Sequence, residues 1–276
     1  MVGLLTACPP QLGTNSRYLL TSSPKPRPTL DLVRARLGDS PVDGLTIDWP
    51  PAFPDRMRKV ITRSGTRRRY VVPCYRYGER EAHGEAAEEE AAFILLDACP
   101  GVEFQEQPAR FTFQWRGKTC QHFPDLLVAS NDRVEFWECK RAEESQDFWI
   151  KKRTERLQEL LAPLHIGYRV VSGLALFDED FLDNAKRVRR FAKHSVSPSS
   201  EAEARAQLDL HGALGFQQLA ERLRSPSPTD DLMAMIYHGN VVTNMGIKLT
   251  PLSQLYTTSD ERRSPWVWQL FDRDKN

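Results

Sequence analysis

The feature that most constrains the fold is a pair of apolar segments joined by a turn and flanked by charged residues. The first segment (126–130) follows Pro124-Asp125, and the second (133–140) ends in Glu138-Cys139-Lys140. Asn131-Asp132 between them is typical of a tight turn, so the segments are predicted to pair as a β-hairpin. The returning strand of such a hairpin brings Glu138 back beside Asp125.

Side chains two residues apart on a strand project from the same face. Glu138 and Lys140 are therefore expected to point the same way, and Cys139 into an opposite apolar layer. Two carboxylates and one ammonium group then converge at one end of a sheet. Carboxylate oxygens suit Mg²⁺, which activates water and polarises phosphate, and a lysine stabilises developing negative charge. The pattern predicts phosphodiester hydrolysis, with Asp125 and Glu138 as metal ligands and Lys140 as a catalytic cation.

A third acid is expected from a helix over 85–98, which is acidic in its N-terminal half. At about 100° per residue, Glu90 falls within the apolar stripe around Phe93 that should face the sheet. We therefore choose Glu90 as the third catalytic acid and metal ligand, with Glu88 and Glu89 as alternatives. Taken singly, a P-D pair is often a turn and an E-x-K pair is often a surface charge pair; their combination at hairpin spacing favours a catalytic site.

The rest of the chain divides into three parts. Residues 1–55 are rich in proline and predict an N-terminal arm, or an ordered extension that depends on the next domain, with one short helix at 30–37. Residues 56–194 predict an α/β domain on a mixed β-sheet flanked by helices. After a Ser/Pro linker, residues 201–276 predict a small, mainly helical, winged-helix-like module and a tail.

Periodicity gives the expected elements of the two domains. A strand over 109–115 turns at Arg116-Gly117-Lys118 into a second strand over 119–130. A long amphipathic helix over 145–164 has the apolar residues Phe148, Trp149, Ile150, Leu157, Leu160 and Leu161. The other expected elements are a strand over 167–172 and helices over 179–192, 201–208, 216–223 and 232–238.

Composition excludes several classes of protein. The 276 residues include 38 basic and 37 acidic residues, a balance that argues against a uniformly basic nucleic-acid coat. No apolar run reaches the length of about 18 residues that a membrane span needs. The five cysteines are scattered and form no C-x-x-C pair, which favours a reducing compartment, the cytoplasm, and a metal held by oxygen atoms.

Beyond these patterns, residues 60–175 resemble the catalytic domain of TnsA, the endonuclease subunit of heteromeric TnsA–TnsB transposases, within the PD-(D/E)xK nuclease superfamily. The resemblance depends on Glu90 to Phe93, the helix exit Asp97–Pro100, Glu106-Gln107-Pro108, Gly117-Lys118, Phe123-Pro124-Asp125 and Glu138-Cys139-Lys140. The first 55 residues have no counterpart in the family, and Cys139 stands where an aliphatic residue is commoner.

The resemblance implies a restriction-endonuclease-like fold and cleavage at the 5′ ends of a bacterial transposon with Mg²⁺, for which Mn²⁺ should substitute. A TnsB-like DDE transposase subunit would cut and join the 3′ ends. The winged-helix-like domain would engage a TnsC-like AAA+ regulator. Two other functions are open: an autonomous nuclease of the restriction or repair type, and a non-catalytic DNA-binding adaptor.

Basic residues indicate where DNA would lie. The strip 56–76 contains arginines and one lysine but no acidic residue. It includes Arg63, Arg67, Arg68 and Arg69, which are candidate contacts for DNA phosphates. Lys151 and Lys152 form a second candidate contact with the DNA backbone, or a solvated helix face paired with nearby glutamates. Trp266, Trp268 and Phe271 are expected in the core of the small domain or in a peptide that docks on a partner.

Overall fold

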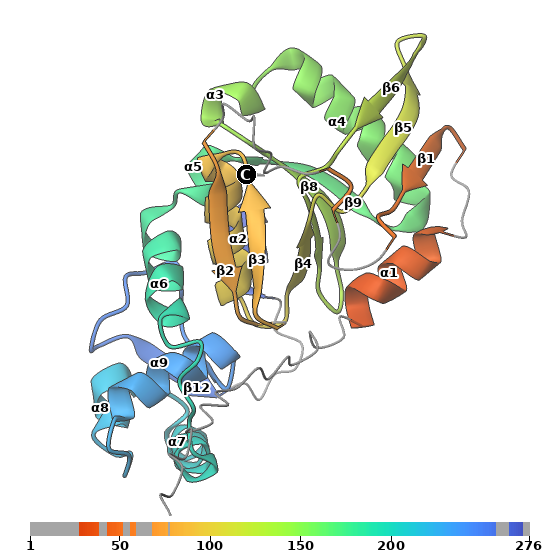
Figure 1. The fold of residues 1–276 in the computed structure, drawn as a ribbon. Coiled ribbons are helices and arrows are strands. Elements are labelled where there is room, and N and C mark those ends of the chain that lie inside the picture. The colour runs from red at the N-terminus through yellow and green to blue at the C-terminus, as the bar shows by residue number, and fades with distance from the viewer. Residues whose placement is uncertain are drawn as a thin grey trace, which may run out of the picture.

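The computed structural model describes residues 28–38, 43–51, 56–58, 68–76, 78–257 and 265–272, and it has a mixed α/β architecture with several small sheets (Figure 1). The strands are β1 (Leu45–Asp48), β2 (Tyr70–Cys74), β3 (Arg80–Gly84), β4 (Glu103–Glu106), β5 (Arg110–Trp115), β6 (Lys118–His122), β7 (Leu126–Ala129), β8 (Val134–Lys140), β9 (Gly167–Ser172), β10 (Leu214–Gly215), β11 (Val241–Val242) and β12 (Gln254–Thr257). The helices are α1 (Pro28–Gly38), α2 (Ala87–Ala98), α3 (Ala142–Ser145), α4 (Phe148–Leu161), the 3₁₀ turn η1 (Ala162–Leu164), α5 (Gly173–Leu176), α6 (Glu179–Arg189), α7 (Pro198–His211), α8 (Phe216–Ala220), α9 (Pro228–His238) and α10 (Trp266–Asp272).

The expected hairpin forms the centre of a sheet ordered β4-β7-β8-β9. Strands β7 and β8 are antiparallel with Leu126 opposite Trp137, which places Asp125 directly before the paired register and across from Glu138. Strand β9 joins β8 in parallel. The predicted hairpin is therefore confirmed, and it carries both acids at one end of the sheet.

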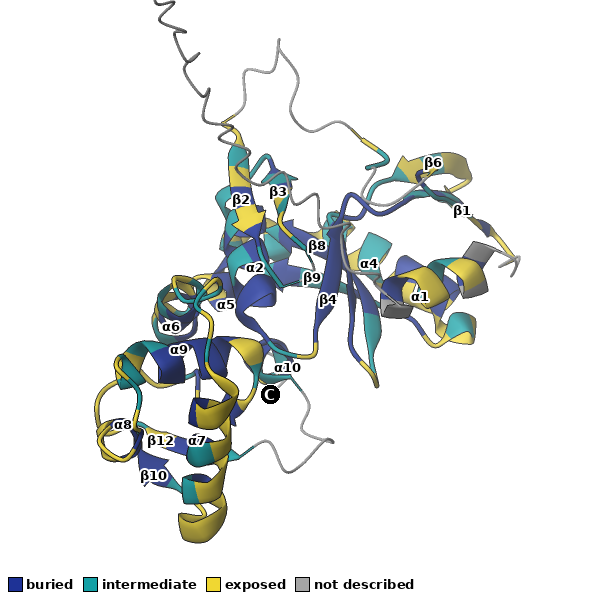
Figure 2. Ribbon diagram, turned by 60° about the horizontal axis from the view of Figure 1, so that its bottom comes forward, coloured by how far each residue is buried: buried dark blue, intermediate teal, exposed yellow. Residues whose placement is uncertain are grey.

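Two apolar cores cover the two faces of this sheet. Trp137 packs in the core that contains Phe93 of α2, whereas its neighbour Phe136 packs in the core that contains Leu157 of α4. Because side chains alternate along a strand, an apolar β8 must be covered on both faces. Strand β4 is likewise buried along its whole length (Figure 2).

The predicted strand over 119–130 is in fact two strands in two sheets. β6 pairs with β5 in a sheet ordered β1-β5-β6, and β7 belongs to the central sheet. Pro124 lies at the break, where it has no backbone N–H to donate to a ladder. The chain changes direction at this break, so that Asp125 lies immediately before β7, at the end of the central sheet.

Part of the predicted N-terminal arm belongs to the α/β unit. Strand β1 pairs with β5, and Leu30 and Leu37 of α1 lie in the same core as Phe111. The described residues of this region match the alternative of an ordered extension. Helix α1 contains the predicted helix 30–37 and begins two residues earlier.

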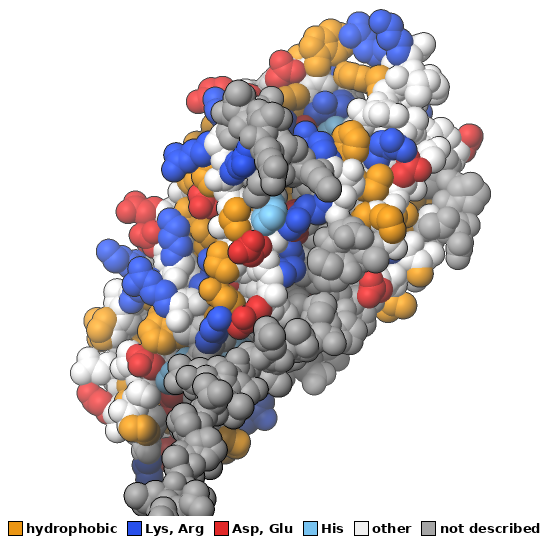
Figure 3. All heavy atoms as spheres, viewed as in Figure 1, with side chains coloured by type: hydrophobic (Ala, Val, Ile, Leu, Met, Phe, Trp, Pro, Cys, Tyr) orange, Lys and Arg blue, Asp and Glu red, His pale blue; other side chains and the backbone are white. Residues whose placement is uncertain are grey.

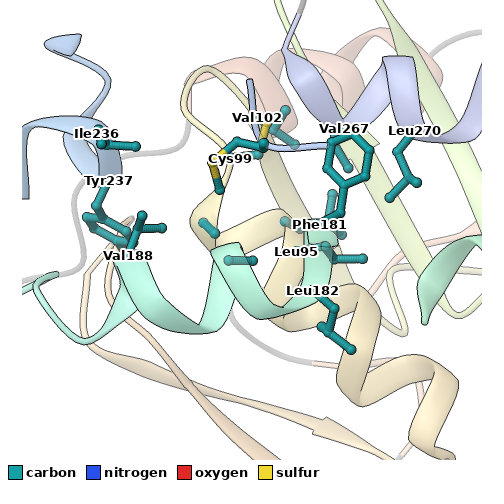
Figure 4. Close-up of a cluster of buried hydrophobic side chains, with 14 of the residues drawn as sticks. Leu95, Cys99, Val102, Phe181, Leu182, Val188, Ile236, Tyr237, Val267 and Leu270 are labelled. Carbon is teal, nitrogen blue, oxygen red and sulfur yellow. The ribbon is translucent and has the colours of Figure 1, made fainter. Parts of the chain in front are cut away.

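The C-terminal region contains α7, α8, α9 and a small sheet ordered β10-β12-β11. Its core is continuous with that of the α/β unit, and Figure 4 shows side chains of α2, α6, α9 and α10 meeting there. The Asn184 side chain of α6 donates to the carbonyl groups of Met245 and Ile247 and accepts from the Leu249 amide. Asn184 thus holds the loop that contains residues 245–249.

Helix α10 packs on the central sheet, in the core that the α/β unit shares with the C-terminal region. The rings of Trp268 and Phe271 contact Trp137 edge-on, with centroids 5.6 and 4.7 Å away. Trp268 Nε1 also donates to Ser130 Oγ at 3.2 Å. Helix α10 is thus core, as one of the two expectations had it, but the core is shared with the α/β unit and lies on the α2 side of the central sheet.

In the described ranges, no helix has the length and apolar character needed to cross a membrane.

Candidate active site

The backbone of the hairpin fixes Asp125 at the end of the central sheet. The Asp125 amide donates to the Trp137 carbonyl at 2.9 Å, and the Cys139 amide donates to Asp125 Oδ2 at 2.9 Å. One carboxylate oxygen of Asp125 is thus held by the partner strand, and the residue as a whole is half-buried. Cys139 itself points into the apolar core, as predicted.

Glu138 lies in a shell of hydrogen-bond donors. Lys140 Nζ is 3.0 Å from Glu138 Oε1, which confirms that the two side chains share a face. Arg153 Nη2 from α4 lies 2.6 and 2.7 Å from the two carboxylate oxygens, and the Tyr168 hydroxyl donates to Oε2 at 2.9 Å. Burial alone would raise the pKa of Glu138, but nearby His122, Lys140 and Arg153 lower it to about 2.

His122, at the end of β6, extends this shell. Its Nε2 is 2.6 Å from the Tyr168 hydroxyl and 3.7 Å from Glu138 Oε2. Burial lowers the pKa of His122 to about 4, so the ring is neutral at pH 7. The cations that stabilise the Glu138 carboxylate at neutral pH are therefore Lys140 and Arg153.

Among the three candidate glutamates of α2, Glu89 is the one whose pKa is raised by the charge of Asp125, whereas the prediction chose Glu90. Glu89 is buried, and its pKa is raised to about 8, first by burial and then by the neighbouring charge of Asp125. Gly84 of β3 makes room for it, because a Cβ there would lie 2.9 Å from Glu89 Cβ. Glu90 is only half-buried. Glu89 lies four residues before Phe93, on the face of α2 that packs against Gly84, and its pKa responds to the charge of Asp125.

The negative charges of Asp125 and Glu89 are only partly compensated by nearby cations. Burial raises the pKa of Asp125 to about 6, although Lys140 opposes the shift. Arg58 is close enough to lower the pKa of both acids slightly, and it forms an ion pair with Glu85 at 3.3 Å. These two acids therefore differ from Glu138, which is neutralised by direct contacts.

Gln107 is a polar residue of the site that the sequence analysis did not select. Its Nε2 lies 3.5 Å from Asp125 Oδ1, and its backbone amide donates to the Asp125 carbonyl at 2.8 Å. The backbone of Gln107 has φ of 45°, which is unusual for a residue other than glycine. Its buried Oε1 has no hydrogen-bond partner among the described residues.

The predicted DNA contacts are scattered. Arg63 and Arg67 lie outside the described residues. Arg68 and Arg69 are exposed just before β2, and the Arg68 guanidinium lies 5.3 Å from the Tyr70 ring centroid.

Lys151 and Lys152 are exposed on α4, the helix that carries Arg153. Lys152 Nζ is 2.7 Å from Glu155, and Lys151 Nζ donates to Gln146 at 2.7 Å. These contacts are those of a solvated helix face, and they leave both ammonium groups accessible.

Gln107, His122 and Tyr168 were not selected from the sequence as residues of the candidate site. Arg153 could have been found, because it is a basic residue on the expected amphipathic helix.

A hard divalent cation such as Mg²⁺ is bound through oxygen ligands. No three His, Cys, Asp or Glu side chains in the described part of the chain are close enough together to form a metal site. The oxygen chemistry fits Mg²⁺, because the charges of Glu89 and Asp125 are only partly compensated and Gln107 Oε1 has no hydrogen-bond partner among the described residues. Glu138 can join them as a ligand only when its contact with Arg153 is broken.

No protein-family model matches the sequence, and a search of curated proteins finds no match either.

Proposed function

We propose that the protein is a metal-dependent DNA endonuclease of the TnsA type that hydrolyses phosphodiesters at the 5′ ends of a transposon. The observation that carries the proposal is the pairing of Asp125 with Glu138 across the β7–β8 hairpin, with Lys140 Nζ 3.0 Å from Glu138. A buried Glu89 from the covering helix supplies the third acid. This is the combination of groups that phosphodiester hydrolysis requires.

The fold of the α/β unit supports the proposal. A mixed sheet ordered β4-β7-β8-β9, with α2 on one face and α4 on the other, is compatible with a restriction-endonuclease-like core. Glu106 at the end of β4 forms ion pairs with Arg56 (2.7 Å) and Arg80 (2.5 Å). The Met57 amide also donates to the Gln107 carbonyl at 3.0 Å, so residues 56 and 57 lie beside the residue that contacts Asp125.

Each residue has a distinct role in the proposed reaction. Asp125 and Glu89 would hold Mg²⁺ or Mn²⁺, joined by Glu138, and the bound cation activates water and neutralises charge on the phosphate. The Cys139 amide orients the Asp125 carboxylate, and Gln107 lines the same side chain. Lys140 is a compact cation that stabilises negative charge developing on the phosphate.

Arg153 has two roles in this proposal. In the structure it neutralises Glu138, and its side chain keeps 24% of its surface exposed. Arginine binds phosphate as readily as carboxylate, through parallel N–H groups. Its buried Nε has no partner among the described residues, so the guanidinium is not fully used by Glu138. A DNA phosphate that attracts Arg153 would release Glu138 for the metal.

The small C-terminal module supports a winged-helix-like domain. Its elements follow the order α7, β10, α8, α9, β11, β12, and β12 pairs with both other strands. In the proposal this module binds a TnsC-like AAA+ regulator, while a TnsB-like DDE transposase subunit processes the 3′ ends. The exposed Lys151 and Lys152, together with Arg68 and Arg69, would contact the DNA backbone.

The test is a cleavage assay on a transposon-end substrate with Mg²⁺, with and without the transposase subunit of the same element, that maps the nicked strand. Cleavage at the 5′ end that depends on the partner supports the proposal. Brisk cutting of plain plasmid without a partner would instead identify an autonomous nuclease of the restriction or repair type.

A second candidate is a non-catalytic DNA-binding adaptor. It is favoured by the contact between Arg153 and Glu138 and by the lack of a three-residue metal cluster in the described ranges. Titration with Mg²⁺ or Mn²⁺ separates the two functions. An endonuclease gains thermal stability from the cation and loses that gain in Asp125→Ala, whereas an adaptor shows no such gain in either form.

A further inference from the structure

Two aromatic residues at the start of α4 are exposed, although the sequence pattern placed them on the apolar side of the helix. Phe148 is 59% exposed and Trp149 is 47% exposed, whereas Leu157 and Leu161 of the same helix are fully buried. These two large adjacent rings do not belong to either buried core. An exposed apolar patch of this kind commonly marks a binding surface.

The rings are held in a fixed arrangement by the β5–β6 hairpin. The Trp149 ring meets Trp115 edge-on at 6.4 Å and Phe148 edge-on at 4.9 Å. Arg116 lies over Trp149, with its guanidinium carbon 4.0 Å from the ring centroid. Arg116 and Gly117 both have positive φ (54° and 74°), which forms the tight turn that brings Arg116 to the helix.

The helix end that carries the rings is also fixed. Asp147 caps α4, and its carboxylate accepts from the amides of Trp149 at 2.8 Å and Ile150 at 3.0 Å. The two aromatic side chains therefore project from a capped helix end and not from a loose loop. We call Trp115, Arg116, Phe148 and Trp149 the aromatic platform.

Basic side chains surround the aromatic platform. Lys118, Lys151 and Lys152 are exposed next to it, and Lys152 Nζ lies 6.0 Å from the Phe148 ring centroid. Acidic residues are also near, in α3 (Glu143 and Glu144). At the top of Figure 3, hydrophobic and basic side chains lie side by side where Figure 1 places α4 and the tip of the β5–β6 hairpin.

The platform has a defined position relative to the candidate active site. Trp149 and Arg153 are four residues apart on α4, so they lie on one face of the helix one turn apart. Arg153 contacts Glu138 directly. A nucleotide whose phosphate reached Arg153 would therefore have a neighbouring base within one helical turn of Trp149.

We propose that the aromatic platform binds unpaired bases of a DNA strand next to the scissile phosphate. Aromatic rings interleaved with arginine and lysine are the groups on which single-stranded nucleic acid stacks, because every base has a π-face and every nucleotide a negative charge. The inference rests on the proposed endonuclease function and specifies its substrate: DNA that is locally unpaired at the cut.

A protein partner is the other class of molecule that exposed aromatics can bind. The three exposed lysines favour a polyanion, since lysine is depleted in protein–protein interfaces. The position of Trp149 one turn from Arg153 adds continuity with a phosphate-binding residue. These two observations decide for nucleic acid.

The test measures binding of the full chain to a fluorescently labelled single-stranded oligonucleotide and to the matching duplex, in EDTA, by anisotropy. The double variant Phe148→Ala/Trp149→Ala should bind the single strand about 5- to 150-fold more weakly, which corresponds to loss of one stacked base. Duplex affinity should change much less. Trp149→Phe should restore most of the loss of Trp149→Ala, and Leu252→Ala, at an exposed residue of the C-terminal module, should have no effect.

Equal affinity of the double variant and the wild type for the single strand would overturn the inference and assign the patch to a protein partner. Both side chains are exposed, so the variants should fold, and circular dichroism checks this. Because no cleavage occurs in EDTA, failure here leaves the active site untouched. Conversely, normal cleavage by Asp125→Ala would remove the proposed active site without altering the binding result.

Discussion

Arg153 Nη2 lies 2.6 and 2.7 Å from the two carboxylate oxygens of Glu138, so one guanidinium nitrogen contacts both oxygens. In the proposed function the same carboxylate is a metal ligand. Lys140 and Tyr168 contact the same carboxylate. Glu138 is consequently the best-compensated acid of the site, and Glu89 and Asp125 are the least. The difference determines which side chains would take up a cation first.

Replacing Arg153 should therefore strengthen cation binding in the absence of DNA. Arg153→Gln removes a charge-assisted contact worth roughly 1.5–3 kcal/mol, which a metal must otherwise displace. We expect Mn²⁺ affinity, measured by calorimetry, to rise about ten-fold or more, and DNA affinity to fall. The matched control is Arg156→Gln on the same helix, which loses only a surface pair with Glu159 at 3.1 Å. Unchanged Mn²⁺ affinity in Arg153→Gln would contradict this role.

The raised pKa of Glu89 predicts how stability depends on pH. The folded protein holds the Glu89 proton more tightly than the unfolded chain, so this group stabilises the fold fully below about pH 4.5 and loses that contribution as the pH rises to about 8. Glu89→Gln cannot ionise. Its free energy of unfolding should exceed that of the wild type at pH 8, by on the order of 1–4 kcal/mol, and match it near pH 4.

Urea denaturation at several pH values measures this difference. Glu90→Gln, at the half-buried next position of α2, is the control and should follow the wild type. A Glu89→Gln protein no more stable than the wild type at pH 8 would show that Glu89 is not a desolvated acid.

The close approach of Gly84 to Glu89 predicts a second, steric effect. A Cβ at position 84 would lie 2.9 Å from Glu89 Cβ and 3.1 Å from the Phe93 ring, so Gly84→Ala must move the helix or the strand. We expect a loss of about 1–3 kcal/mol of stability together with reduced cleavage. Gly173→Ala, whose new Cβ would have only ordinary contacts at 3.5 Å or more, should be tolerated. Equal stability of the two variants would contradict the placement of Glu89.

The position of α10 predicts a large effect of a residue near the C-terminus. Phe271 is buried and meets Trp137 edge-on with ring centroids 4.7 Å apart. Phe271→Ala should cost about 3–5 kcal/mol in the free energy of unfolding, measured by chemical denaturation. Leu252→Ala, at a highly exposed position, serves as the control. A loss below about 1 kcal/mol in Phe271→Ala would mean that α10 is not part of the core.

Local patterns predicted the parts of this fold that depend on short-range pairing. The hairpin that carries Asp125 and Glu138 follows from two apolar segments and one turn, and its register follows from their length. Strand β9 has the predicted bounds, 167–172, because the aromatic and β-branched residues Tyr168, Val170 and Val171 favour a strand. The shared face of Glu138 and Lys140 follows from strand alternation alone.

The parts that were missed depend on tertiary contacts. The burial of Glu89 in place of Glu90 involves a close approach of α2 to Gly84 on another strand, which periodicity within the helix does not reveal. The split of 119–130 between two sheets and the docking of α10 on Trp137 likewise involve partners distant in sequence. Tyr168 and His122 gave no signal, because each looks like an ordinary strand residue until the sheets bring them to Glu138.

The central claim is tested most directly by strand cleavage with Asp125→Ala and Glu138→Ala, measured on a transposon-end substrate in the presence of Mg²⁺ and the partner transposase subunit. The account predicts that each substitution abolishes cleavage at the 5′ end while circular dichroism and DNA binding remain close to wild type, and that Lys140→Ala loses cleavage but keeps metal binding. Cleavage at the wild-type rate by either Asp125→Ala or Glu138→Ala would contradict it.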